Sequence, residues 1–128
     1  MANILVVEDN KTTLNGLTAV LSESGHKVYE ASDGAEGIEK AIEQDNIDLI
    51  LTDLHLPRKN GVEMISELRN YGKFKKTEVI FYTTETNETL KTQGKKLGVR
   101  YCFIKPVPDK ILIESIQKVL ERGAEASS

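Results

Sequence analysis

Several polar residues directly follow or end short apolar runs of the sequence, and their types suit phosphoryl chemistry. They are Glu8, Asp9, Asp53, Thr83 and Lys105. Carboxylates gathered in one crevice repel one another and therefore favour a hard divalent cation, and Mg²⁺ fits because it also coordinates phosphate oxygens. An aspartate can act as the nucleophile and form an aspartyl-phosphate. A lysine would neutralise the phosphoryl charge and a threonine hydroxyl would donate a hydrogen bond, since phosphoryl transfer depends on positioning and neutralisation.

The stretch from Asp48 to Pro57 carries the most informative of these residues. Its apolar part, Leu49 to Leu51, lacks polar alternation and predicts a strand buried on both faces. A charge inside such a strand is costly unless it is paired or bound to a metal, so Asp53 is expected where the strand ends. In open α/β sheets, ligands bind in the crevice outside the carboxyl ends of the strands. Asp53 is therefore the predicted reactive group.

Apolar periodicity predicts five strands that alternate with five helices. The strands are expected at Ile4–Val7, Lys27–Ala31, Leu49–Leu51, Val79–Tyr82 and Tyr101–Ile104. The helices are expected to turn apolar residues inward, among them Leu17, Leu21, Ile38, Ile42, Ile65, Leu68, Ile111 and Ile116. This alternation predicts an α/β fold with a parallel sheet, helices on both faces and right-handed crossovers. The polar residues at the strand ends would then share one edge of the sheet.

The fourth predicted helix, from about Asn87 to Leu97, has the weakest pattern. It contains Gly94, and a glycine costs up to about 1 kcal/mol against alanine inside a helix, so we expect this helix to be mobile. The connection at 73–76 is expected to be solvated. The last helix is expected to stop at Gly123, so that residues 1–122 form the domain and 123–128 form a flexible tail or the start of a linker.

Composition excludes several classes of function. The chain has 128 residues, the size of one domain, and a formal net charge of −3 with both signs spread along it. Nucleic-acid binding would need clustered basic residues, and a membrane span would need roughly 20 apolar residues. The N-terminus lacks the basic region of a signal peptide. The single cysteine, Cys102, excludes an intrachain disulfide and is expected to be a buried apolar residue, so a cytoplasmic protein is expected.

Four motifs in order resemble the receiver domain of the two-component response regulators, over about residues 2 to 122. They are Ile4–Asp9 (ILVVED), Leu51–Pro57 (LTDLHLP) with Asn60-Gly61, Val79–Thr83 (VIFYT) and Lys105-Pro106. The resemblance implies a (βα)5 flavodoxin-like, doubly wound parallel sheet with strand order 2-1-3-4-5. It also implies that a histidine kinase or histidine phosphotransfer protein donates a phosphoryl group to Asp53. The Mg²⁺ ligands implied by the resemblance are Glu8, Asp9, Asp53 and the backbone carbonyl of His55, while Thr83 and Lys105 contact the phosphoryl oxygens.

The resemblance further implies a signalling switch rather than an enzyme, with only self-phosphorylation and self-dephosphorylation expected. The phosphoryl group adds about 2 negative charges, Thr83 moves toward it, and the fourth helix follows. The face formed by the fourth helix, the fifth strand and the fifth helix then changes its affinity for a partner. The expected partners are a downstream protein target or output domain and, on phosphorylation, a second copy of the chain.

Two positions depart from the family pattern. Cys102 stands three residues before Lys105, where family members often carry a tyrosine or phenylalanine that turns inward on activation. Tyr101 and Phe103 flank it, but strand alternation places both on the opposite face. Thr84 stands where alanine or glycine is usual and where the side chain controls access to the aspartate. We therefore expect slower phosphorylation by small donors and slower hydrolysis.

Other families share part of this residue set. Phosphatases of the haloacid dehalogenase type carry a second aspartate two residues after the nucleophile, where this chain has His55. Flavodoxins need a phosphate loop rich in serine, threonine or glycine where this chain has Glu8 and Asp9. A receiver that acts only as a scaffold is disfavoured because every phosphoacceptor residue is present. Whether the chain is a stand-alone receiver or part of a larger regulator with an output domain stays open.

Overall fold

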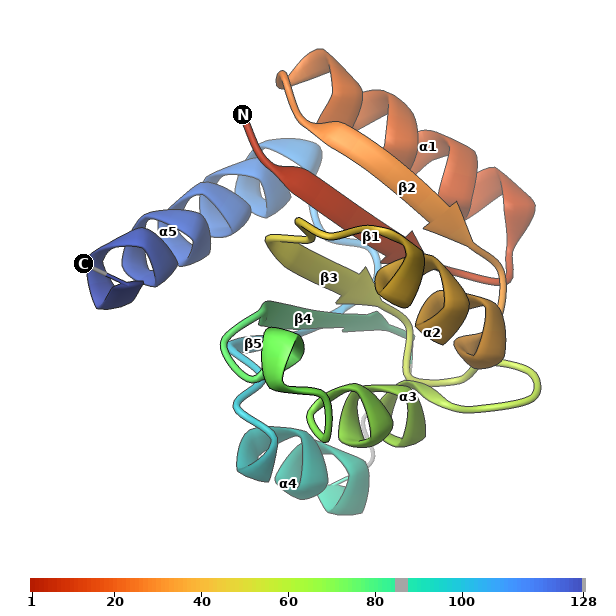
Figure 1. Cartoon of the computed structure of the whole chain (residues 1–128). Helices are drawn as coiled ribbons and strands as arrows, with labels where there is room; N and C mark the ends of the chain where they lie inside the picture. Colours follow the sequence, from red (N-terminus) through yellow and green to blue (C-terminus); the bar gives the residue numbers. More distant parts are fainter. Residues whose placement is uncertain (85–87, 128) are drawn as a thin grey trace.

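A five-stranded parallel sheet forms the centre of the computed structural model, which describes residues 1–84 and 88–127 (Figure 1). The strands are β1 (Asn3–Val7), β2 (Lys27–Ala31), β3 (Leu49–Thr52), β4 (Glu78–Thr83) and β5 (Tyr101–Ile104). They lie in the order β2-β1-β3-β4-β5. The predicted α/β fold class, strand order and parallel pairing are confirmed.

Helices cover both faces of the sheet. They are α1 (Lys11–Glu23), α2 (Gly34–Glu43), α3 (Gly61–Leu68), α4 (Glu88–Lys96) and α5 (Asp109–Ser127), with a 3₁₀ turn, η1 (Gly72–Phe74). Successive strand side chains point to opposite faces, so Leu5 and Val7 join one core cluster with α2 and α3, while Ile4 and Val6 join another with α1 and α5. In the described part of the chain, none of the helices combines the length and the apolar character that a membrane span requires.

Three side chains lie differently from the sequence prediction. Ile42 is 40% exposed and Ile111 is 47% exposed, because each lies beside the buried stripe of its helix rather than on it. Phe74, which was expected in a solvated connection, is buried in η1 with its ring edge-on to Tyr71. The apolar periodicity of a helix therefore located the buried face but not its margins, and a short 3₁₀ turn left no periodic signal.

Of the two glycines predicted to weaken or end helices, Gly94 is a tight packing position, whereas a side chain at Gly123 would make only ordinary contact with its neighbours. Helix α5 continues through Gly123 to Ser127, so the predicted stop is wrong. A Cβ at Gly123 would lie 3.4 Å from Glu78 Cγ, and one at Gly94 would lie only 2.6 Å from Phe81 Cε2. Glycine thus lets α4 approach the sheet closely. Helix α4 begins at Glu88, whereas the predicted start, Asn87, lies outside the described residues.

The glycines of α1 and α4 provide a matched pair of stability measurements. Replacing Gly16, which has no atom within 4 Å of a built Cβ, with alanine should raise the free energy of unfolding by up to about 1 kcal/mol. Gly94→Ala should lower it by about 1 kcal/mol, because the overlap with Phe81 exceeds the gain in helix propensity. Urea denaturation measures both, and a stabilised Gly94→Ala protein would show that α4 does not depend on this close contact.

Candidate functional site

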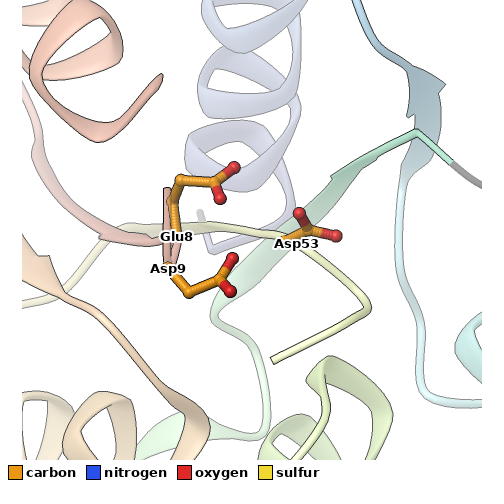
Figure 2. Close-up of side chains that lie close together, drawn as sticks. All are labelled: Glu8, Asp9 and Asp53. Carbon is orange, nitrogen blue, oxygen red and sulfur yellow. The ribbon is translucent and has the colours of Figure 1, made fainter. Parts of the chain in front are cut away.

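Three carboxylates meet at the carboxyl ends of β1 and β3 (Figure 2). Glu8 and Asp9 directly follow β1, and Asp53 directly follows β3. The two strands are neighbours with Val7 paired to Thr52, so the residues after them must lie side by side. One oxygen from each carboxylate lies within 4.8 Å of the others. The structure thus brings together the three acids that the sequence predicted for one crevice.

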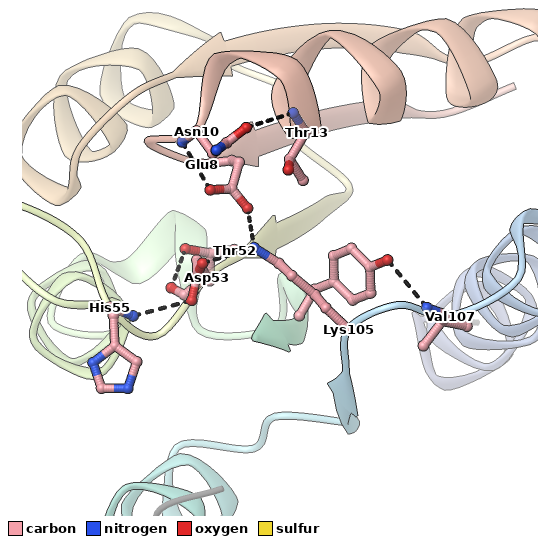
Figure 3. A network of polar contacts seen from close by, with 9 residues as sticks. Glu8, Asn10, Thr13, Thr52, Asp53, His55, Lys105 and Val107 are labelled. Carbon is pink, nitrogen blue, oxygen red and sulfur yellow. Dashed lines mark hydrogen bonds and ion pairs between the residues drawn. The ribbon is translucent and has the colours of Figure 1, made fainter. Parts of the chain in front are cut away.

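The ammonium of Lys105 bridges two of these carboxylates (Figure 3). Its Nζ lies 2.8 Å from Asp53 Oδ2 and donates a second hydrogen bond to Glu8 Oε1. Burial acts to lower the pKa of Lys105, but the hydrogen bonds and charges of Asp53 and Glu8 outweigh it and hold that pKa above its usual range. The lysine side chain therefore keeps its charge and offsets part of the repulsion among the acids.

The backbone around Asp53 fixes the position of its carboxylate. The Asp53 amide continues the sheet by donating to Val7 O at 3.0 Å, and Oδ1 accepts a hydrogen bond from the His55 amide at 3.1 Å. Gly61 packs against the same backbone, because a Cβ there would lie 2.5 Å from Asp53 O. With 8% of its surface exposed, Asp53 is held firmly yet still accessible from one side.

Glu8 and Asp9 are adjacent in sequence but differ in their surroundings. Glu8 is 2% exposed, and its Oε2 accepts a hydrogen bond from the Asn10 amide at 3.0 Å. The Asn10 side chain in turn caps α1 by accepting from the Thr13 amide. Asp9 is exposed. Glu8 is therefore held in place within the protein, whereas the Asp9 side chain faces solvent and is accessible to a ligand.

The remaining predicted residues lie at or near the ends of β3 and β4 and within β5. Thr83 is the last residue of β4 and is fully buried, and its carbonyl accepts a hydrogen bond from the Lys105 amide at 2.8 Å. Thr84 and His55 are exposed. The prediction that Cys102 is buried is wrong: it is only partly buried, because it lies in β5, the outermost strand beside β4. It packs on the core side that faces α4, and burial raises the pKa of its thiol. Tyr101 and Phe103 belong to the opposite cluster, as strand alternation predicted.

Two supporting features of the site were not predicted from the sequence. The ring centroid of Tyr82 lies 5.5 Å from Lys105 Nζ, and the Tyr82 hydroxyl accepts a hydrogen bond from the Val107 amide at 3.2 Å. Arg58, whose φ is +66°, pairs with Asp33 and ties the loop after β3 to the start of α2. Neither contact follows from periodicity, since each joins residues far apart in the chain.

The donor set fits a magnesium ion. All three acids offer oxygen ligands, which a hard cation prefers, and Mg²⁺ commonly takes only one or two carboxylates and retains waters. The exposed Asp9 and the partly open Asp53 leave room for such waters. Lys105 neutralises Glu8 and Asp53 only in part, because three carboxylates face one ammonium. A divalent cation would remove the remaining excess of negative charge.

Replacing Lys105 with methionine should lower the free energy of unfolding by about 3 kcal/mol at neutral pH, because Glu8 would be left buried without its cation. Adding Glu8→Gln to Lys105→Met should restore more than half of the loss. Lys110→Met, at an exposed lysine of α5, is the matched control and should change little. Urea denaturation of the wild type, Lys105→Met, Glu8→Gln, the double variant and Lys110→Met measures the coupling, and additive effects of the two site substitutions would contradict it.

Comparison with known proteins gives one consistent result. The family model described as the response regulator receiver domain matches residues 4–117. Protein PilH of Pseudomonas aeruginosa is 37% identical, with 94% of this chain and 98% of that protein aligned. The transcriptional regulatory protein CpxR of Klebsiella pneumoniae is 33% identical, but the aligned region covers 96% of this chain and only 51% of that protein.

Solved structures agree with the sequence relatives. The chemotaxis response regulator CheY4 of Vibrio cholerae superposes with a TM-score of 0.85 at 30% identity, covering 93% of this chain and 98% of that one. A CheY-like receiver domain from Methanospirillum hungatei gives a TM-score of 0.91 at 25% identity over 98% of each chain. Taken with the five-stranded sheet and the acidic cluster at its edge, these matches show that the chain belongs to the response regulator receiver domain family of two-component signalling.

Proposed function

We propose that Asp53 accepts a phosphoryl group from the phosphohistidine of a histidine kinase or histidine phosphotransfer protein. The observation that carries this proposal is the position of the Asp53 carboxylate, which is bonded to Lys105, lies beside two further acids and remains partly exposed. In the reaction a carboxylate oxygen forms the new P–O bond, the P–N bond to the donor histidine breaks, and the imidazole nitrogen leaves with the electron pair.

Each neighbouring residue has a proposed role in this transfer. Lys105 would pair with phosphoryl oxygens by turning its ammonium from Asp53 toward them, and Thr83 would donate its hydroxyl hydrogen. Glu8, Asp9, Asp53 and the backbone carbonyl of His55 would hold Mg²⁺, directly or through water. When bound, the ion would neutralise charge on the transferring phosphoryl group. These roles are supported by the common position of the residues at the carboxyl ends of the strands and by the chemical types of their side chains. The proposed ligand set needs no residue from elsewhere.

We further propose that phosphorylation changes the surface around α4, β5 and α5. Thr83 ends β4, and α4 begins only a few residues later, at Glu88. Among the described residues of α4 only Gly94 is buried, so a displacement of this helix would chiefly change the contact of Gly94 with Phe81 and the packing of the partly buried Leu90. A downstream protein or an output domain would distinguish the two states by its affinity. A second copy of the phosphorylated chain is another proposed partner, and the proposed setting is the cytoplasm.

Phosphorylation of Asp53 can be tested directly. Incubation with acetyl phosphate and Mg²⁺ should increase the intact mass by one phosphoryl group, because the carboxylate is the only proposed acceptor. Asp53→Asn should abolish the increase, and removal of Mg²⁺ with a chelator should reduce it severely. Asp48→Asn, whose carboxylate accepts a hydrogen bond from the Asn3 amide at the other edge of the sheet, is the matched control. Undiminished labelling of Asp53→Asn would disprove the proposed acceptor.

Thr84 tests the proposed control of access to Asp53. Thr84→Ala should accelerate both phosphorylation by acetyl phosphate and hydrolysis of the phosphorylated protein, since a smaller side chain would admit the donor and water more readily. Rates are measured by mass spectrometry after mixing and after removal of the donor. Thr18→Ala in α1 is the control. If both rates stay unchanged in Thr84→Ala, this threonine does not control access.

A further inference from the structure

A cavity of about 570 Å³ lies at the amino ends of the strands, which is the end of the sheet opposite to Asp53. It is bordered by the starts of β4 and β5, the turn after α4 and the end of α5, which Figure 1 shows near the beginning of β4. Its charged lining residues are Arg69, Lys75, Lys76, Arg100, Arg122 and Glu78. Five cations therefore face one carboxylate in a chain whose formal net charge is −3.

Arg69 fixes a positive charge in the wall of this cavity. Its Nε donates to Leu97 O at 3.0 Å, and its Nη1 donates to Thr77 O at 2.8 Å and to Phe74 O. Burial lowers the pKa of Arg69, with the charge of Glu78 acting in the opposite direction. All of its hydrogen-bond partners in the described part of the chain are backbone carbonyls, so the guanidinium is oriented and partly desolvated without a carboxylate bonded to it.

The single carboxylate of the cavity is already engaged by another arginine. Glu78 Oε2 lies 2.7 Å from Arg100 Nε, and Oε1 accepts a longer hydrogen bond from Arg100 Nη2 at 3.3 Å. This contact raises the pKa of Arg100. Among the side chains of residues 1–84 and 88–123, no ion pair involves Lys75, Lys76 or Arg122. The charges of Lys75, Lys76 and Arg122 are therefore available to an anionic ligand, and Arg69 adds a fixed positive charge in the cavity wall.

We propose that this cavity binds a ligand that carries two or more linked phosphates, either a nucleoside polyphosphate or an inorganic polyphosphate. Guanidinium groups match phosphate oxygens in geometry, and several cations around one space favour several linked anionic groups over a single one. The cavity volume lies within the range of about 300 to 1,000 Å³ typical of small-molecule sites. The proposal does not depend on phosphorylation of Asp53, because it uses no residue of that edge.

Calorimetric titration of the full chain tests this site, with sodium tripolyphosphate, inorganic phosphate and adenosine triphosphate as probes in magnesium-free buffer. Tripolyphosphate should bind one to one, at least about tenfold more tightly than inorganic phosphate. Lys76→Gln/Arg122→Gln removes two exposed cations of the cavity and should weaken binding by about tenfold or more. Lys27→Gln/Lys118→Gln removes the same charge from exposed positions elsewhere and should leave affinity within about twofold.

Backbone amide shifts locate the binding. Perturbations should centre on Gly98 and Gly123, which line the cavity, and should spare Asp53. Tighter binding of adenosine triphosphate than of tripolyphosphate would assign the cavity to a nucleotide, and equal affinity would assign it to the phosphate chain alone. Both results support the proposal. The absence of saturable binding, equal weakening in the two double variants, or shifts confined to the Asp53 edge would overturn it.

Discussion

Electrostatic repulsion among Glu8, Asp9 and Asp53 is the constraint around which the carboxyl edge of the sheet is organised. The neighbouring positions of β1 and β3 force these acids together, and burial of Glu8 increases the cost of an uncompensated charge. One ammonium, on Lys105, reaches two of the acids from the end of β5. The cluster therefore retains an affinity for further positive charge, which is the physical basis of the proposed magnesium binding and phosphoryl transfer.

The elements around this edge hold the acids in place by ordinary backbone interactions. Asn10 links Glu8 to the start of α1, and the Asn60 capping box begins α3 just after the loop that carries Asp53. Gly61 permits close contact between that helix and the Asp53 carbonyl. Because these contacts are made by turns and helix ends, the Asp53 carboxylate is positioned by the same hydrogen bonds that end the strands and begin the helices.

The parts of the fold predicted from the sequence are those with strong periodic patterns. The uninterrupted apolar run Leu49–Leu51 identified a buried strand, and the acids after two such runs could be placed on one edge because parallel strands share their direction. By contrast, the packing role of Gly94 depends on Phe81, which lies on another element. From the sequence, a glycine in a helix predicts only a loss of helix stability, because the residue that packs against it is not known.

The functional site, like the fold, has parts that the sequence predicted and parts that it did not. Asp53 and Lys105 could be identified from the sequence because complementary polar residues, including Glu8, Asp9 and Thr83, end several predicted strands at once. The hydrogen bond between Tyr82 and Val107 and the cavity beside Arg69 could not be predicted from the sequence, because each is formed by residues that are distant in the chain. Cys102, which has no aromatic ring, lies on the face of β5 that packs toward α4. Among the contacts between α4 and the sheet is the close approach of Gly94 to Phe81.

The dependence of stability on Mg²⁺ tests the central electrostatic claim most directly. The free energy of unfolding of the wild-type protein should rise with Mg²⁺ concentration, approaching about 1.4 kcal/mol per tenfold increase once the site is saturated. Asp9→Asn should lose most of this rise, whereas Asp45→Asn, at an exposed acid away from the cluster, should keep it. An equal response of all three proteins would contradict the claim that the clustered acids hold the ion.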